Sequence, residues 1–171
     1  RLGAAMCSDL KAGAMVPSDH PLHVGVPFNK LSEPGKAAIR GADVILSLGS
    51  IDLGGMLHQA FGADAPSATI IHAGQDQHLQ RGWTADHYGL APVDVEMLCG
   101  ADAAAAEILA ALPNGTPARP VIPAAAAPAP AGALGLRDVA AVLRNAVGDT
   151  PVSFASLARG WPVDLWPHRA P

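Results

Sequence analysis

Histidines, cysteines and glycine-containing turns are the parts of this sequence that could support chemistry. His20 and His23 are spaced as two metal ligands could be, but no second histidine pair or cysteine cluster with ligand spacing accompanies them. Cys7 and Cys99 stand in apolar runs, which predicts buried free thiols and a reducing, cytoplasmic setting. A buried thiol is inert, and no G-x-S-x-G turn is present to expose a serine nucleophile. We therefore expect neither a metal site nor a catalytic residue on this chain.

The residues best placed to hold a ligand follow two apolar runs that are typical of buried strands. Gly49 and Ser50 follow the first run, and Gly74 and Asp76 follow the second. Open parallel sheets bind nucleotides at the carboxyl ends of their strands, so these four residues form a candidate crevice. A phosphate loop with its Lys-Ser/Thr pair and a G-x-G-x-x-G fingerprint are both absent from the sequence, which weakens this hypothesis.

Apolar runs bounded by turn residues alternate along the chain with segments of helical character. Strands are predicted at residues 4–8, 43–48, 68–73 and 93–98, and helices at 34–40, 53–60 and 101–112. This alternation predicts an α/β fold with a doubly wound, mostly parallel sheet that has helices on both faces. Half of the residues are hydrophobic but only 4% are aromatic, so the core must be built from aliphatic side chains.

A change of composition predicts two domains. Residues 116–133 are mostly Pro and Ala and should form an extended linker, which separates a central sheet domain at 1–115 from the incomplete start of a second domain at 134–171. The second part should contain a helix at 136–147 and a strand at 151–155. Its two tryptophans, Trp161 and Trp166, are expected to pack on a neighbouring domain.

The charge distribution excludes two classes of partner. The formal net charge is −4, and the Lys and Arg residues are scattered, so no electrostatic footprint for nucleic acid or an anionic membrane is visible. No run of about 18 apolar residues is present to span a bilayer.

Several local phrases resemble the central domain of the thiamine-diphosphate-dependent superfamily of acetolactate synthase, benzoylformate decarboxylase and pyruvate oxidase. The phrases are Asp19-His20-Pro21-Leu22-His23-Val24-Gly25, Ala42-Asp43-Val44-Ile45-Leu46-Ser47-Leu48-Gly49, Ile70-Ile71-His72 with Asp76, and Trp83-Thr84-x-Asp86-His87. They follow the order of that family across residues 4–112. Residues 134–171 similarly resemble the opening of the family's diphosphate-binding domain.

This resemblance implies a parent enzyme with thiamine diphosphate and Mg²⁺, a decarboxylase or an acetolactate-synthase-like lyase or transferase that acts on 2-oxo acids. The implied role of this chain is structural and non-catalytic. The family's G-D-G motif with its Asn is missing, since Gly148-Asp149 is followed by Thr150. The activating glutamate and the first central strand would lie before Arg1, so the sheet could be short of one strand.

The resemblance also bears on partners. The implied partners are the missing amino- and carboxy-terminal domains of the same polypeptide and further copies of it in a homo-oligomer. An exposed edge strand would favour such association.

The resemblance bears on nucleotide binding as well. FAD-binding relatives often carry an Arg after the Leu-Gly turn, where this chain has Ser50 and Ile51. They also tend to have two acids after I-I-H, and here Gly74 replaces the first. These departures weigh against FAD or ADP. The alternative hypothesis is a free-standing module that binds an adenine nucleotide (FAD, ADP or NAD).

Overall fold

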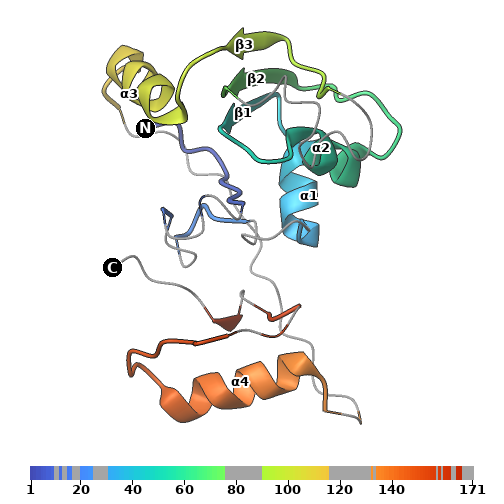
Figure 1. Cartoon of the computed structure of the whole chain (residues 1–171), viewed down its shortest axis with the longest axis vertical. Helices are drawn as coiled ribbons and strands as arrows, with labels where there is room; N and C mark the ends of the chain where they lie inside the picture. Colours follow the sequence, from blue (N-terminus) through green and yellow to red (C-terminus); the bar gives the residue numbers. More distant parts are fainter. Residues whose placement is uncertain are drawn as a thin grey trace.

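Helices and strands alternate along the chain, as the computed structural model in Figure 1 shows. The structure describes residues 1–9, 12, 15–16, 20–24, 31–75, 90–115, 132, 134–156, 158, 160–162 and 165–166. The elements within these residues are, in order, α1 (Glu33–Arg40), β1 (Val44–Leu48), α2 (Leu53–Phe61), β2 (Thr69–Ala73), β3 (Val95–Met97), α3 (Ala101–Ala111) and α4 (Leu136–Val147).

The three strands form one parallel sheet in the spatial order β1-β2-β3. The register pairs Ile45 with Ile70 and Ser47 with His72, so these four side chains share one face. All three arrows in Figure 1 point towards α3, while α1 and α2 lie side by side on the other side of the strands. The chain therefore has the predicted α/β fold, with parallel strands and interleaved helices.

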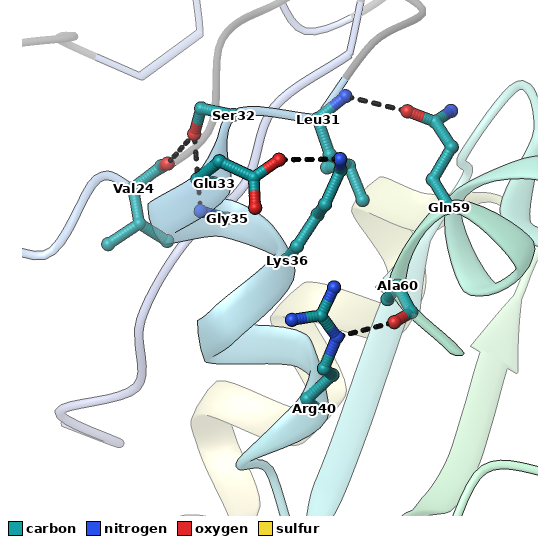
Figure 2. A network of polar contacts seen from close by, with 9 residues as sticks. All are labelled: Val24, Leu31, Ser32, Glu33, Gly35, Lys36, Arg40, Gln59 and Ala60. Atoms are coloured by element: carbon teal, nitrogen blue, oxygen red, sulfur yellow. Dashed lines mark hydrogen bonds and ion pairs between the residues drawn. The ribbon is translucent and has the colours of Figure 1, made fainter. Parts of the chain in front are cut away.

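Helix α1 begins at a side-chain cap. The hydroxyl of Ser32 accepts the N–H of Gly35 at 3.1 Å and donates to the carbonyl of Val24 at 2.8 Å (Figure 2). Pro34 fits the first turn because its missing N–H would have had no acceptor within the helix. These contacts fix where α1 starts, one residue before the predicted helix.

Two hydrogen bonds join α1 and the residue before its cap to α2 (Figure 2). Nε of Arg40 donates to the carbonyl of Ala60 at 2.5 Å, and the N–H of Leu31 donates to Oε1 of Gln59 at 2.8 Å. Helix α2 ends at Gly62, which has the positive φ of 66° that glycine adopts without strain. The two helices thus form one layer that is tied together at both ends of α1.

That layer packs on the face of the sheet that carries Ile70. The buried residues of this core are Leu53, Leu57, Ile70 and Ala91, and Ile39, Ile45, Phe61 and Val93 pack around them. Burial of each large aliphatic side chain stabilises the fold by about 1.5–3 kcal/mol. The core is aliphatic apart from Phe61, as the composition predicts.

The opposite face of the sheet is apolar but incompletely covered. We call it the outer sheet face, and it carries Val44, Leu46, Leu48, Thr69, Ile71, Ala73, Val95 and Met97, of which Ala73 is fully buried. Val44 is 48% exposed, Leu48 is 41% exposed and Val95 is 47% exposed. Helix α3 contacts only β1 closely, with Ala101 beside the turn at Gly49.

The strand predicted at residues 4–8 is wrong. Only Met6 pairs, in an isolated bridge with His23, where the N–H of Met6 donates to the carbonyl of Leu22 at 2.7 Å. The segment makes this one parallel bridge instead of joining the sheet. Cys7 is therefore exposed, contrary to the prediction, and Cys99 has intermediate exposure; both are free thiols.

Helix α4 coincides with its predicted bounds and packs against two tryptophans. Ala140 is fully buried between Trp161 and Trp166, and the guanidinium carbon of Arg144 lies 5.7 Å from the centroid of the Trp166 ring. The prediction that these tryptophans pack on a neighbouring domain is wrong, because their own helix buries them.

The strand predicted at 151–155 is also wrong. The segment is exposed and lies beside no described strand. The ring of Phe154 instead packs edge-on against Trp166, with centroids 4.9 Å apart.

Two further predictions concern the chain as a whole. The linker predicted at 116–133 falls outside the described residues except for Gly132, so the domain boundaries stay predictions. None of the described helices has the length and apolar character needed to cross a bilayer.

Candidate functional site

The candidate crevice lies where β1 and β2 end. The N–H of Gly49 donates to the carbonyl of Ala73 at 2.7 Å, and the N–H of Gly74 donates to the carbonyl of Met97 at 3.2 Å. Gly49 has a φ of 65°, and a Cβ built on it would lie 3.1 Å from that of Ala101. The structure therefore brings Gly49, Ser50 and Gly74 to one edge, as the sequence predicts, while Asp76 lies outside the described residues.

Ser50 is the polar side chain of this edge that faces inward. Its hydroxyl oxygen is buried and has no hydrogen-bond partner. The backbone next to it is held from upstream, since the N–H of Ile51 donates to Oδ2 of Asp9 at 2.8 Å. Sequence reasoning missed Asp9. No sequence signal pointed to Asp9, because the run at 4–8 that precedes it is not a strand of the sheet and the contact spans 42 positions of the chain.

His72 is held below the edge by a buried polar contact. Its Nδ1 lies 3.0 Å from the hydroxyl oxygen of Ser47, and the two residues are 4% and 6% exposed. A Cβ added to Gly74 would lie 2.6 Å from Nε2 of His72, so the ring fills the space beside this glycine. His72 therefore acts as a cross-strand core residue, and Gly74 is required there for its lack of a side chain.

Ser8 and His23 form a second hydrogen-bonded pair, which the sequence did not predict. Nε2 of His23 lies 2.8 Å from the hydroxyl oxygen of Ser8. Burial of the ring, and then the charge of the nearby His20, lower the pKa of His23 below its ordinary value of 6.5.

A neutral imidazole can accept a proton from a serine hydroxyl. However, the described part of the chain has no carboxylate hydrogen-bonded to His23, so the orienting group of a nucleophilic triad is missing.

The charges around the crevice are acidic. Asp9 binds the backbone after β1, and Asp52 caps α2 by accepting the N–H of Gly55 at 2.8 Å. Asp102 lies in the first turn of α3, which no side chain caps. These carboxylates occupy or adjoin the N–H groups that a phosphate would otherwise use, so the edge disfavours an anionic ligand.

The described residues do not fit a Mg²⁺-diphosphate site. Gly148 ends α4 with a φ of 53°, and Asp149 follows it at the negative end of the helix dipole. No group of three or more His, Cys, Asp or Glu side chains among the described residues could hold a metal ion.

Comparison with protein-family models, with curated proteins and with solved structures found no match to this chain.

Proposed function

We propose that this chain is a non-catalytic spacer layer, the central domain of a thiamine-diphosphate-dependent enzyme that acts on 2-oxo acids. Its role would be to hold two cofactor-binding neighbours apart and to take part in subunit packing. The cofactor and Mg²⁺ would be bound by those neighbours and would supply the cleavage or formation of a bond next to the 2-oxo acid carbonyl. The free thiols suit a reducing, cytoplasmic setting.

One observation carries this proposal. The phrases A-D-V-I-L-S-L-G and I-I-H form the adjacent parallel strands β1 and β2, and the phrase D-H-P-L-H-V-G leads into the bridge between His23 and Met6. Two of the phrases that resemble the family thus form neighbouring strands of an α/β layer, while Asp76 and the phrase Trp83-Thr84-x-Asp86-His87 lie outside the described residues. The acidic crevice supports a structural role over a nucleotide site.

Sequencing the encoding gene on both sides of this segment tests the proposal. We expect an upstream V-x-E region that activates the thiamine ring and a downstream G-D-G motif with its Asn. If both are absent from a gene that extends far enough to contain them, the assignment to this superfamily is refuted.

A second candidate function is the binding of an adenine nucleotide at the crevice. The buried, unpartnered hydroxyl of Ser50, directly after the positive-φ turn at Gly49, is the observation that favours it. Thermal unfolding with FAD, ADP, NAD or thiamine diphosphate separates the two functions, because a ligand at 100 times its Kd stabilises a protein by about 2.7 kcal/mol.

We expect no shift with any of these four ligands. A shift with an adenine nucleotide that Ser50→Ala abolishes would establish the second function in place of the first. Ser67→Ala is the matched control, since Ser67 is exposed and precedes β2, at the opposite end of that strand from Gly74.

A further inference from the structure

The segment that follows α3 contains the one Asn-Gly pair of the sequence. Helix α3 ends at Ala111, and the chain bends at Asn114 and Gly115. Both of these residues are exposed. No hydrogen bond among the described residues uses the side chain of Asn114 or the N–H of Gly115. The side-chain amide and the backbone amide that follows it are therefore open to solvent and held by no contact.

Nothing crowds the backbone nitrogen of Gly115. A Cβ built on this glycine would have no heavy atom within 4 Å, apart from its chain neighbours. Glycine also leaves the backbone a wide choice of conformations. The nitrogen of Gly115 can therefore approach Cγ of Asn114 without disturbing any packed part of the fold.

An asparagine amide beside such a nitrogen is chemically reactive. The backbone nitrogen of Gly115 attacks Cγ of Asn114, and the new N–C bond closes a five-membered succinimide ring. The side-chain nitrogen leaves as ammonia and takes up the proton of the attacking N–H. Water then breaks the ring at either of its two carbonyls, which gives an aspartate or an isoaspartate. The net change is the uptake of water and the release of ammonia.

We propose that Asn114 is a site of spontaneous deamidation in the folded protein, with water as the only co-reactant. The reaction places a negative charge just beyond the carboxyl end of α3, and the isoaspartate product adds a methylene group to the backbone there. The modified residue lies directly before the Pro/Ala-rich segment at 116–133. This property is independent of the proposed function.

The fold supplies a positive charge next to this position. Nη1 of Arg1 donates to the carbonyl of Leu109 at 2.6 Å and to that of Leu112 at 3.5 Å, at the carboxyl end of α3. A carboxylate beyond a helix carboxyl end is normally unfavourable, because that end carries the negative pole of the helix dipole. The guanidinium of Arg1 offsets this pole, so the folded state should tolerate the product.

Asn145 is the matched control within the same chain. It lies inside α4, and Ala146 follows it. The backbone nitrogen of Ala146 is part of the regular hydrogen-bonding of the helix, and its residue carries a Cβ. The helix therefore keeps this nitrogen away from Cγ of Asn145. The structure predicts that Asn114 reacts in the folded chain and that Asn145 does not.

Ageing of the full chain at neutral pH, followed by tryptic peptide mapping, tests the proposal. The two asparagines lie in separate peptides, 82–137 and 145–159, and neither peptide contains another asparagine or a glutamine. The first peptide should gain the mass of amide-to-acid conversion in the folded chain. Its rate should be within about threefold of the rate in urea, because a segment without hydrogen bonds opens at almost no cost. The second peptide should react only in urea.

Gly115→Ala tests the mechanism. The open space around Gly115 lets this variant fold, which circular dichroism checks, while the added Cβ crowds the attacking nitrogen. Deamidation of Asn114 should slow on the order of tenfold, because alanine also restricts the backbone. The aged wild-type chain should keep the far-ultraviolet circular dichroism of the fresh chain.

Three results would overturn the proposal. Asn114 that stays intact in the folded chain but reacts in urea would show that the fold protects it. An unchanged rate in Gly115→Ala would exclude attack by this nitrogen. A loss of helix that accompanies deamidation would show that the folded state does not accept the product.

Discussion

Replacement of Ser47 by alanine tests whether His72 is a structural residue of the core. The hydroxyl of Ser47 in β1 lies 3.0 Å from Nδ1 of His72 in β2, and both side chains are almost completely buried on the same face of the sheet. Removal of the hydroxyl leaves a buried ring nitrogen without this partner. A buried polar group that loses its partner destabilises a fold by about 1–3 kcal/mol, so the free energy of unfolding should fall by that amount.

Urea unfolding followed by far-ultraviolet circular dichroism measures the loss. The linear dependence of the unfolding free energy on urea concentration gives the change from the shift of the midpoint, provided that the slope is unchanged. Ser67→Ala serves as the control, and its exposed position predicts a change within about 0.5 kcal/mol.

A double-mutant cycle with His72→Leu then isolates the pair. The contact predicts that Ser47→Ala costs less in the His72→Leu background, with an interaction energy of about 0.5–1.5 kcal/mol. Additive effects of the two substitutions, or a loss below about 0.5 kcal/mol for Ser47→Ala alone, would refute the structural role of the pair.

Three further predictions follow from single contacts. Burial and the charge of His20 lower the pKa of His23, so the unfolded chain binds this proton more readily than the folded chain. The free energy of unfolding should therefore fall as the pH drops below 6.5 towards the folded pKa. His23→Gln should remove this contribution to the pH dependence of stability. Burial raises the pKa of the Cys7 thiol although the residue as a whole is exposed. In the Cys99→Ser background, iodoacetamide should therefore alkylate Cys7 at pH 8 more slowly in the folded protein than in urea. Arg40→Ala removes the bond to the carbonyl of Ala60 and should destabilise the protein by about 0.5–1.5 kcal/mol in urea unfolding.

Each of these predictions can be contradicted by a specific result. For His23, a pH profile that His23→Gln leaves unchanged would contradict the assigned origin of the slope. For Cys7, folded and unfolded rates that agree would show that its surroundings do not desolvate the thiol. For Arg40, the comparison variant is Lys36→Ala, because the surface ion pair of Lys36 and Glu33, 2.7 Å apart, should contribute no measurable stability. If Lys36→Ala lowers the free energy of unfolding as much as Arg40→Ala does, the bond of Arg40 to Ala60 has no special role in stability.

The sequence by itself determined the fold class and most element positions. The aliphatic runs at 43–48 and 68–73 became β1 and β2 because buried parallel strands need nearly continuous apolar side chains. Capping residues set the helix ends: Asp52 begins α2 and Gly62 ends it. Gly49, Ser50 and Gly74 could be placed at one edge from the sequence alone, because the carboxyl ends of parallel strands lie together.

Long-range contacts decided what the local patterns could not. The runs at 4–8 and 151–155 have strand-like composition, but a strand requires a neighbour with free backbone groups along its length. Among the described residues the first run has only the single bridge of Met6 with His23, and the second run pairs with no strand. The exposure of Cys7 followed from this, as did the packing of Phe154 on a tryptophan. Composition does not reveal such outcomes, since the partner lies far away in the sequence.

The polar contacts of the candidate site were also a tertiary result. Asp9 reaches Ile51 across 42 positions of the chain, and His72 meets Ser47 across 25. In the sequence, Asp9 and His72 are each a single polar residue in or next to an apolar run. Only the register of β1 against β2, and the return of the first segment to the sheet edge, decided that their side chains would meet, because that register fixes which residues share a face.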